Sequence, residues 1–145
     1  MDRATDAAAR HFARTVARAS DDQLLRVMRS PLRAVVLRTI FAVMPFRFDA
    51  EQAAKTRGVL EFRIGGRRRG RATQYQVSIA DGRARIKRNG GADPSAVIEV
   101  GGPEFLQLAA GVASAPDLYS RGKLTIGGNL MTAVVMSALF RMPSR

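Results

Sequence analysis

The chain has no cysteine and only one histidine among its 145 residues. The lack of cysteine excludes disulfide bonds, thiolate metal ligands and cysteine nucleophiles. His11 stands among arginines, and no serine occurs in a G-x-S-x-G sequence, so a Ser-His-acid relay is not expected. The acidic residues fall mostly at helix caps and turns, and no cluster has the spacing of metal ligands. We therefore expect no catalytic residues, no metal and no cofactor, and hence a protein that is not an enzyme.

Long apolar runs are also missing. The run at 130–140 is about half of the roughly 20 residues that a membrane-spanning helix needs. Residues 1–20 mix acids and bases and lack the uninterrupted apolar stretch of a signal peptide. These features predict a cytoplasmic protein.

Acidic residues are few: 12 Asp and Glu stand against 24 Lys and Arg, which gives a net charge of +12. A basic balance of this size favours anionic partners, either nucleic acid or a membrane surface. The helical stripe of Arg10, Arg14 and Arg18 and the basic run at 67–71 are candidates for transient contact with anionic headgroups. Ordinary solvated surface is the favoured explanation for both groups, and a GC-rich genome also enriches arginine. Aromatic residues make up only 6%, and the predicted sheet lacks the aromatic pairs that stack bases, so nucleic acid is the less favoured partner.

Three helices are predicted in the first third of the chain. Apolar residues recur at helical spacing over 5–19, and the SDDQ sequence at 20–23 has the spacing of a capping box that opens a second helix. Ser30 followed by proline predicts the start of a third helix. We expect residues 1–30 to form an N-terminal helical extension. The third helix is predicted to have a wide apolar face made of Leu32, Val35, Val36, Thr39, Ile40 and Val43.

From Gly58 the apolar period changes from helical spacing to two. Four short runs alternate apolar and polar residues and are joined by Gly, Asp and Asn turns, which is typical of an antiparallel meander with one covered face. This pattern assigns Glu61 and Glu99 to the solvent face. A helix, a fifth strand and a final helix follow, so the fold class is α+β. The five predicted strands cover 59–64, 73–79, 83–88, 95–100 and 123–126.

Two glycine-rich stretches are candidates for phosphate-binding loops. GGRRRGRAT at 65–73 lacks the lysine of a phosphate loop and joins strand to strand, so it is rejected. IGGN at 126–129 is better explained as a tight turn whose asparagine caps the final helix. That helix has no polar face and must be covered on several sides, either as a core helix or as the wall of a cavity. Its methionines favour the cavity, because flexible thioethers suit variable ligands.

The order of elements and the C-terminal sequence resemble the sterol carrier protein 2 family, in particular its bacterial stand-alone members. The resemblance covers roughly residues 37–142 and leaves the first thirty outside. One position departs from the family pattern, because Asn129 stands where an acid is usual. The residues that carry the resemblance are Phe105, Leu108, Gly111, Gly122, Lys123, Leu124, Ile126, Gly128, Leu130, Leu139 and Phe140.

The resemblance implies a five-stranded, mainly antiparallel, twisted sheet covered by helices, with an apolar tunnel between the two layers. It implies that residues 31–145 form a lipid-binding domain, a non-catalytic carrier of a fatty acid, an acyl-CoA or a sterol-like ligand. The candidate lining residues are Phe62, Ile64, Tyr75, Val77, Ile98, Phe105, Leu124, Ile126, Leu130, Val134 and Leu139.

Two other functions stay open at this point. The domain could be a ligand-free scaffold or dimerisation domain for a partner protein, because Phe41, Phe105 and Phe140 are large enough to fill the tunnel. It could also be a basic nucleic-acid-binding protein.

Overall fold

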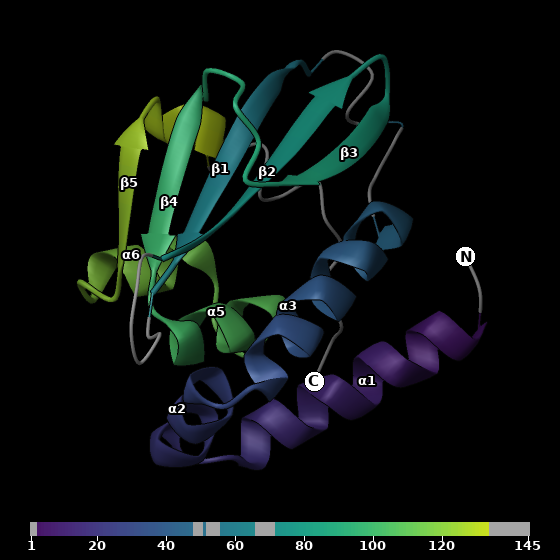
Figure 1. Ribbon diagram of the computed structural model, residues 1–145, viewed down its shortest axis with the longest axis vertical. Coiled ribbons are helices and arrows are strands. Elements are labelled where there is room, and N and C mark those ends of the chain that lie inside the picture. The colour runs from purple at the N-terminus through teal and green to yellow at the C-terminus, as the bar shows by residue number, and fades with distance from the viewer. Residues whose placement is uncertain (1–2, 48–50, 52–55, 66–71, 134–145) are drawn as a thin grey trace.

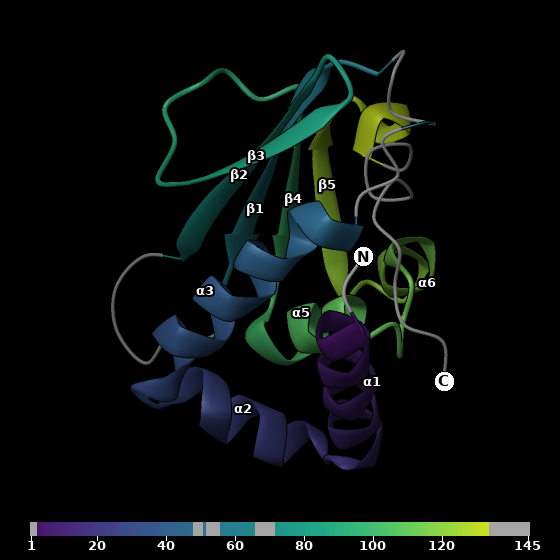
Figure 2. The same ribbon diagram turned by 90° about the vertical axis from the view of Figure 1, so that its right-hand side faces the viewer.

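A five-stranded sheet, with helices gathered along one face and at one end, forms the framework of the computed structural model (Figures 1 and 2). The structure describes residues 3–47, 51, 56–65 and 72–133. The described helices are α1 (Arg3–Arg18), α2 (Asp21–Arg29), α3 (Leu32–Val43), the 3-10 helix η1 (Met44–Arg47), α5 (Gly102–Ala109) and α6 (Ala115–Ser120). The strands are β1 (Gly58–Ile64), β2 (Thr73–Ala80), β3 (Arg83–Arg88), β4 (Ala96–Val100) and β5 (Leu124–Gly128).

The predicted capping signal of α2 is confirmed, whereas the N-cap of α3 is Pro31 and not the predicted Ser30. Ser20 and Gln23 form the predicted capping box: each side chain accepts a hydrogen bond from the other residue's backbone N–H. α1 and α2 also bury side chains in the same hydrophobic core as the strands, among them Ala13, Val16 and Met28. The division of the chain at residue 30 stays a prediction.

The strands lie in the order β3–β2–β1–β4–β5. Three neighbouring pairs are antiparallel, whereas β1 and β4 are parallel. The predicted five-stranded, mainly antiparallel sheet is confirmed, but the prediction that the first four strands form a simple meander is wrong. Alternation shows which face of a strand is covered and carries no information about which strand lies beside it.

The connection between β3 and β4 makes this topology possible. Asp81 and Gly82, with φ of 54° and 71°, form a tight turn that holds β3 beside β2. Residues 89–95 then cross β2 and β1 on the face opposite the helices (Figure 2). Seven residues reach up to about 23 Å, and three inter-strand steps need only about 14 Å.

This crossover covers a carboxylate on the outer face of the sheet. The Glu61 side chain is only 3% exposed. Its Oε1 accepts hydrogen bonds from Nε2 of Gln74 at 2.7 Å and of Gln76 at 2.8 Å, and its Oε2 accepts one from Nε of Arg63 at 2.6 Å. Gln76 in turn donates to the carbonyl of Ala92 and accepts from its N–H, which ties the crossover to the sheet. The prediction that Glu61 faces solvent is therefore wrong, because the connection that covers it was not foreseen.

The network keeps this buried carboxylate ionised. Burial alone raises the pKa of Glu61, but the hydrogen bonds from Gln76, Arg63 and Gln74 and the charge of Arg63 outweigh burial and lower that pKa below its usual value. Folding therefore favours the ionised form.

We expect Glu61→Gln to reduce the free energy of unfolding at neutral pH by about 1–3 kcal/mol, since charge-assisted hydrogen bonds are lost. Because the folded-state pKa is lowered, this contribution is present above the unfolded-state pKa and disappears as the pH falls through the folded-state value. Urea unfolding of both proteins from pH 7 down to acid measures the difference. A difference that stays constant or grows on acidification contradicts the assignment.

A buried arginine holds α3 against the ends of β1 and β2. Arg33 donates through Nη1 to the carbonyls of Met28 at 3.2 Å and Gly65 at 2.8 Å, and through Nη2 to the carbonyl of Ile64. Its Nε and Nη2 also donate to Oγ1 of Thr73, at 3.3 and 3.0 Å. One guanidinium thus joins the end of α2, the start of α3 and two strands, and it satisfies carbonyls where β1 ends.

We expect Arg33→Met to lower the free energy of unfolding by about 3 kcal/mol or more, because three backbone carbonyls lose charged donors. Arg38→Met is the matched control, since Arg38 lies on the exposed side of the same helix and its loss is expected to stay within about 0.5 kcal/mol. Urea unfolding measures both changes. Similar losses in the two variants contradict the role given to Arg33.

Candidate functional site

Most of the predicted lining residues meet on the face of the sheet that the helices cover. The strand register aligns Tyr75, Phe62, Ile98 and Ile126 as one row across β2, β1, β4 and β5. A second row, towards the start of β5, includes Ile64 and Leu124, while Val77 lies in the row on the other side. The residues that are buried here are Phe62, Ile64, Tyr75, Val77, Ile98, Phe105 and Leu124, seven of the eleven.

Aromatic rings fill the part of this layer between α3, α5 and the middle of the sheet. The ring of Phe41 stacks on Tyr75, with centroids 4.0 Å apart and planes at 11°, and on Phe105 at 5.4 Å. Phe62 meets both phenylalanines edge to face, at 5.7 and 5.8 Å. These distances are those of rings in direct contact. Phe41 and Phe105 are two of the side chains that we expected to be large enough to fill a tunnel. Both occupy the part of the layer under β1 and β2.

Apolar side chains become accessible at the opposite end, beside β5. Ile126 is half-buried, and it is the last member of a row whose other members are fully buried. Leu130 and Met131 follow the strand and are 44% and 65% exposed. The two remaining predicted lining residues, Val134 and Leu139, lie outside the described residues. The layer thus changes from packed rings under β1 and β2 to accessible aliphatic side chains beside β5.

α6 adds a wall that the sequence had not assigned to the site. The segment forms a helix over Ala115–Ser120, and the hydroxyl of its N-cap Ser114 accepts a hydrogen bond from the N–H of Asp117. Its Leu118 is completely buried, and α6 lies next to β5. The Ser114–Pro116–Asp117 pattern, a cap followed by proline in the first turn, is the signal that indicates this helix.

The IGGN turn is a structural cap, as predicted. Gly128 has φ of 75°, and the Oδ1 of Asn129 accepts a hydrogen bond from the N–H of Thr132 at 3.0 Å. A Cβ on Gly128 would lie 2.7 Å from the carbonyl oxygen of Ser95. The glycine therefore lets the chain turn close to β4 before the helical turn that begins at Leu130.

We expect Gly128→Ala to destabilise the fold by about 2 kcal/mol or more, through the left-handed backbone and the close contact. Gly127→Ala is the control, because its added Cβ would meet only Val97, at 3.9 Å, and its φ is not positive. Thermal and urea unfolding compare the two. Equal losses would show that the turn does not depend on the conformation of Gly128.

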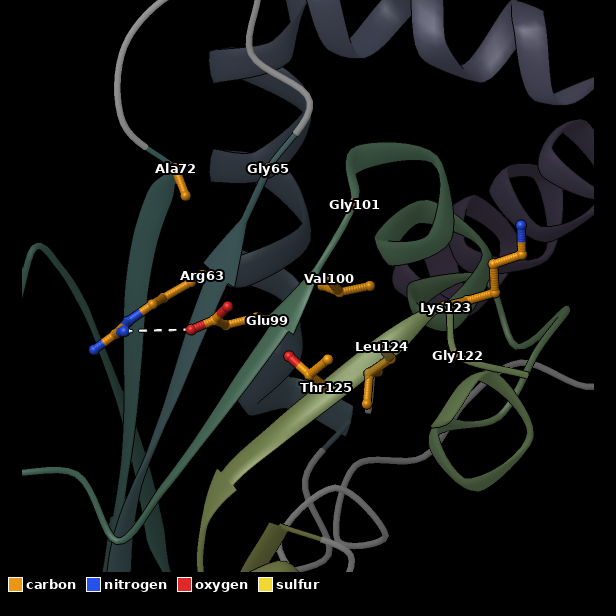
Figure 3. A pocket seen from close by; sticks show the side chains of 10 residues that line it. All are labelled: Arg63, Gly65, Ala72, Glu99, Val100, Gly101, Gly122, Lys123, Leu124 and Thr125. Carbon is orange, nitrogen blue, oxygen red and sulfur yellow. Dashed lines mark hydrogen bonds and ion pairs between the residues drawn. The ribbon is translucent and has the colours of Figure 1, made fainter. Parts of the chain in front are cut away.

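A hollow lies at one end of the sheet, and both polar and apolar residues line it. This open groove of about 510 Å³ runs along the ends of β1 and β4 and the start of β5 (Figure 3). Arg63, Glu99 and Thr125 lie side by side along it, and Arg63 is paired with the carboxylate of Glu99 at 3.5 Å. Arg63 also binds Glu61, so its charge is already matched by two acids. Val100 and Leu124 also line the groove, so it reaches the edge of the apolar layer where β4 ends and β5 begins.

The described part of the chain holds neither a metal site nor a membrane-spanning helix. No three histidine, aspartate or glutamate side chains gather there as metal ligands. Among the same residues, no helix combines the length and the apolar character needed to cross a membrane.

The model of the SCP-2 sterol transfer family matches residues 46–141. The match takes in the sheet, α5, α6 and β5, and it covers well over half of the chain. The protein therefore belongs to the SCP-2 sterol transfer family, as the sequence had indicated. A comparison with curated proteins gave no significant match.

Solved structures share the fold at low sequence identity. Sterol carrier protein 2 like 2 from Aedes aegypti gives a TM-score of 0.59 at 18% identity. The alignment covers 74% of this chain and 98% of that protein. The palmitated form of the same mosquito protein gives a TM-score of 0.58. Sterol carrier protein 2 from Yarrowia lipolytica gives a TM-score of 0.52 at 20% identity. The alignment covers 79% of this chain and 84% of that protein.

A larger protein also contains this fold. The sec-alkylsulfatase Pisa1 from Pseudomonas sp. gives a TM-score of 0.65 at 15% identity over 77% of this chain, but the chain covers only 17% of that enzyme. At these identities the likeness shows the fold alone.

Proposed function

We propose that the protein binds one lipid with a long apolar chain and carries it without changing it chemically. The observation that carries this proposal is the apolar layer between sheet and helices, which is closed by rings at one end and reaches accessible aliphatic side chains at the other. Membership of a sterol transfer family supports the same function.

The ligand's chain would enter beside β5 and lie along Ile126 and Leu130. The ligand's chain would stop at the contacting rings of Phe41, Phe62, Tyr75 and Phe105, which block the layer under β1 and β2. Burial of about ten methylenes at roughly 0.8 kcal/mol each gives about 8 kcal/mol, which corresponds to micromolar binding before ordering costs. No specific polar contact is needed, which suits a fatty acid, an acyl-CoA or a sterol-like ligand.

The proposed carrier has no catalytic step. The alkylsulfatase neighbour is an enzyme, but the similarity concerns only a small part of its chain. A ligand-free scaffold for a partner protein is the second candidate, and the direct contact among the four rings is the observation that favours it.

Two measurements test the proposal. The purified protein is extracted with organic solvent and the extract is analysed by mass spectrometry. The melting temperature of the protein is then measured with palmitate, palmitoyl-CoA and a sterol. We expect about one lipid per chain, or a rise in melting temperature with at least one of the three. If no lipid co-purifies and none of the three raises the melting temperature, the carrier function fails and the scaffold is favoured.

A matched pair of variants locates the site. Ile126 and Ile86 are both half-buried on the helix side of an edge strand, on β5 and β3 respectively. We expect Ile126→Trp to weaken binding of the best ligand about tenfold or more by filling the proposed space, and Ile86→Trp to leave the affinity unchanged. Equal effects in a titration would place the ligand elsewhere.

Transient contact with an anionic membrane belongs to the same proposal. Arg10, Arg14 and Arg18 are exposed on α1, whereas residues 67–71 lie outside the described part. Nucleic acid is the competing partner for these charges, and its binding would fall steeply with salt.

A further inference from the structure

The sheet has an edge at β3 that carries a full strand of unpaired backbone. β3 is the last strand in the order, so among the strands only β2 pairs with it. Their ladder is unbroken from Arg83 opposite Ala80 to Arg88 opposite Tyr75. β3 contains neither a proline nor a bulge, two of the features that protect edge strands from further pairing. In Figure 2, β3 lies in front of the other strands. The edge is therefore regular enough to accept another strand.

Every second residue of β3 turns its backbone groups outward. The N–H of Asn89 donates to the carbonyl of Gln74 at 3.0 Å, so these two residues form a hydrogen-bonded pair at the end of the ladder. Bonded and non-bonded pairs alternate along an antiparallel ladder. The N–H and C=O groups of Ala84, Ile86 and Arg88 therefore point away from β2. Within the described part of the chain, no residue bonds to these outward groups.

Three cations line the outer face of the same edge. Arg83, Arg85 and Lys87 alternate along β3, and Lys87 lies opposite Gln76, a member of the outer-face network. All three are exposed, and their side chains form no ion pair or hydrogen bond with a described residue. Ile86 lies between them on the helix side and is half-buried. The edge thus presents cations on one side and an aliphatic side chain on the other.

We propose that β3 accepts an acidic, extended segment of a partner protein as a sixth, antiparallel strand of the sheet. Carboxylates at alternate positions of that segment would face Arg83, Arg85 and Lys87. The residues between them would be apolar and would lie beside Ile86. In this arrangement the three cations stand in the pairs without mutual hydrogen bonds, where opposing side chains lie closest.

The charge of the edge selects this occupant. Two copies of β3 would place like charges opposite each other, which is destabilising. A nucleic acid would match the cations, but β3 contains no aromatic residue on which bases could stack, and phosphates cannot use a row of alternating donors and acceptors. An acidic strand matches both the charges and the backbone. This inference goes beyond the carrier function, because it assigns a partner-binding edge at the other end of the sheet from β5.

A pair of N-methylated peptides tests strand addition directly. Both are short blocked peptides of alternating glutamate and valine. In the proposed register the valine N–H groups bond to β3, whereas the glutamate N–H groups point away. We therefore expect the peptide methylated at its glutamates to bind, and the peptide methylated at its valines to bind about tenfold more weakly or worse. Titration followed by NMR measures both affinities, and amide exchange at Ala84 and Ile86 should slow only in the complex.

A matched pair of protein variants tests the charges. We expect Arg85→Glu to weaken binding of the glutamate-methylated peptide about tenfold, and Arg10→Glu, at an exposed cation of α1, to leave it unchanged. Circular dichroism checks that both variants are folded.

Several results would overturn the proposal. These are no binding of either peptide, equal binding of the two, or equal effects of the two arginine variants. An oligothymidylate that displaces the peptide at lower concentration would assign the edge to nucleic acid, and a dimer that Arg85→Glu alters would assign it to a second copy. Lipid content is measured on the same samples by extraction, so the edge and the carrier function fail or hold separately.

Discussion

The hydrogen bonds of Arg33 are the interaction on which the helical layer depends. A guanidinium buried beneath a surface helix is stable only when its donors are matched, and here backbone carbonyls at the ends of α2 and β1 match them. Because the sheet fixes the carbonyls of Ile64 and Gly65 and α2 fixes that of Met28, the position and rotation of α3 are fixed as well. Phe41 is thereby held against Tyr75, and the aromatic end of the apolar layer is closed.

The outer face of the sheet is held by a second polar network of the same kind. Glu61 receives two glutamine amides and an arginine, and Gln76 ties the crossover to it. This network allows β4 to lie parallel to β1, next to β5, and so it places Ile98 and Ile126 in one row. The space proposed for the lipid depends on both networks, although neither touches it.

Periodicity and local capping predicted much of the fold. The strands, the Ser20 capping box and the turn at Gly128 all follow from residues that are close in sequence. The parallel pairing of β4 and the burial of Glu61 could not be predicted, because both depend on how a seven-residue connection crosses the sheet. The orientation of α3 was missed for a related reason. Apolar residues lie on most sides of this helix, so spacing favoured the face of Leu32 and Val35 over the stripe that is buried. The partners of Arg33 are backbone carbonyls, which have no sequence signal. The candidate lining residues came from alternation and family resemblance, and seven of them do share one buried layer.

The central claim is that a lipid lies along β5 and the start of the last helix, and not under α3. Cross-linking with a photoactivatable fatty acid, followed by peptide mapping, tests it most directly. The account predicts a single adduct per chain, on the segment that contains Ile126 and Leu130. Adducts on α3 or β2, or none at a saturating concentration of the fatty acid, would contradict it.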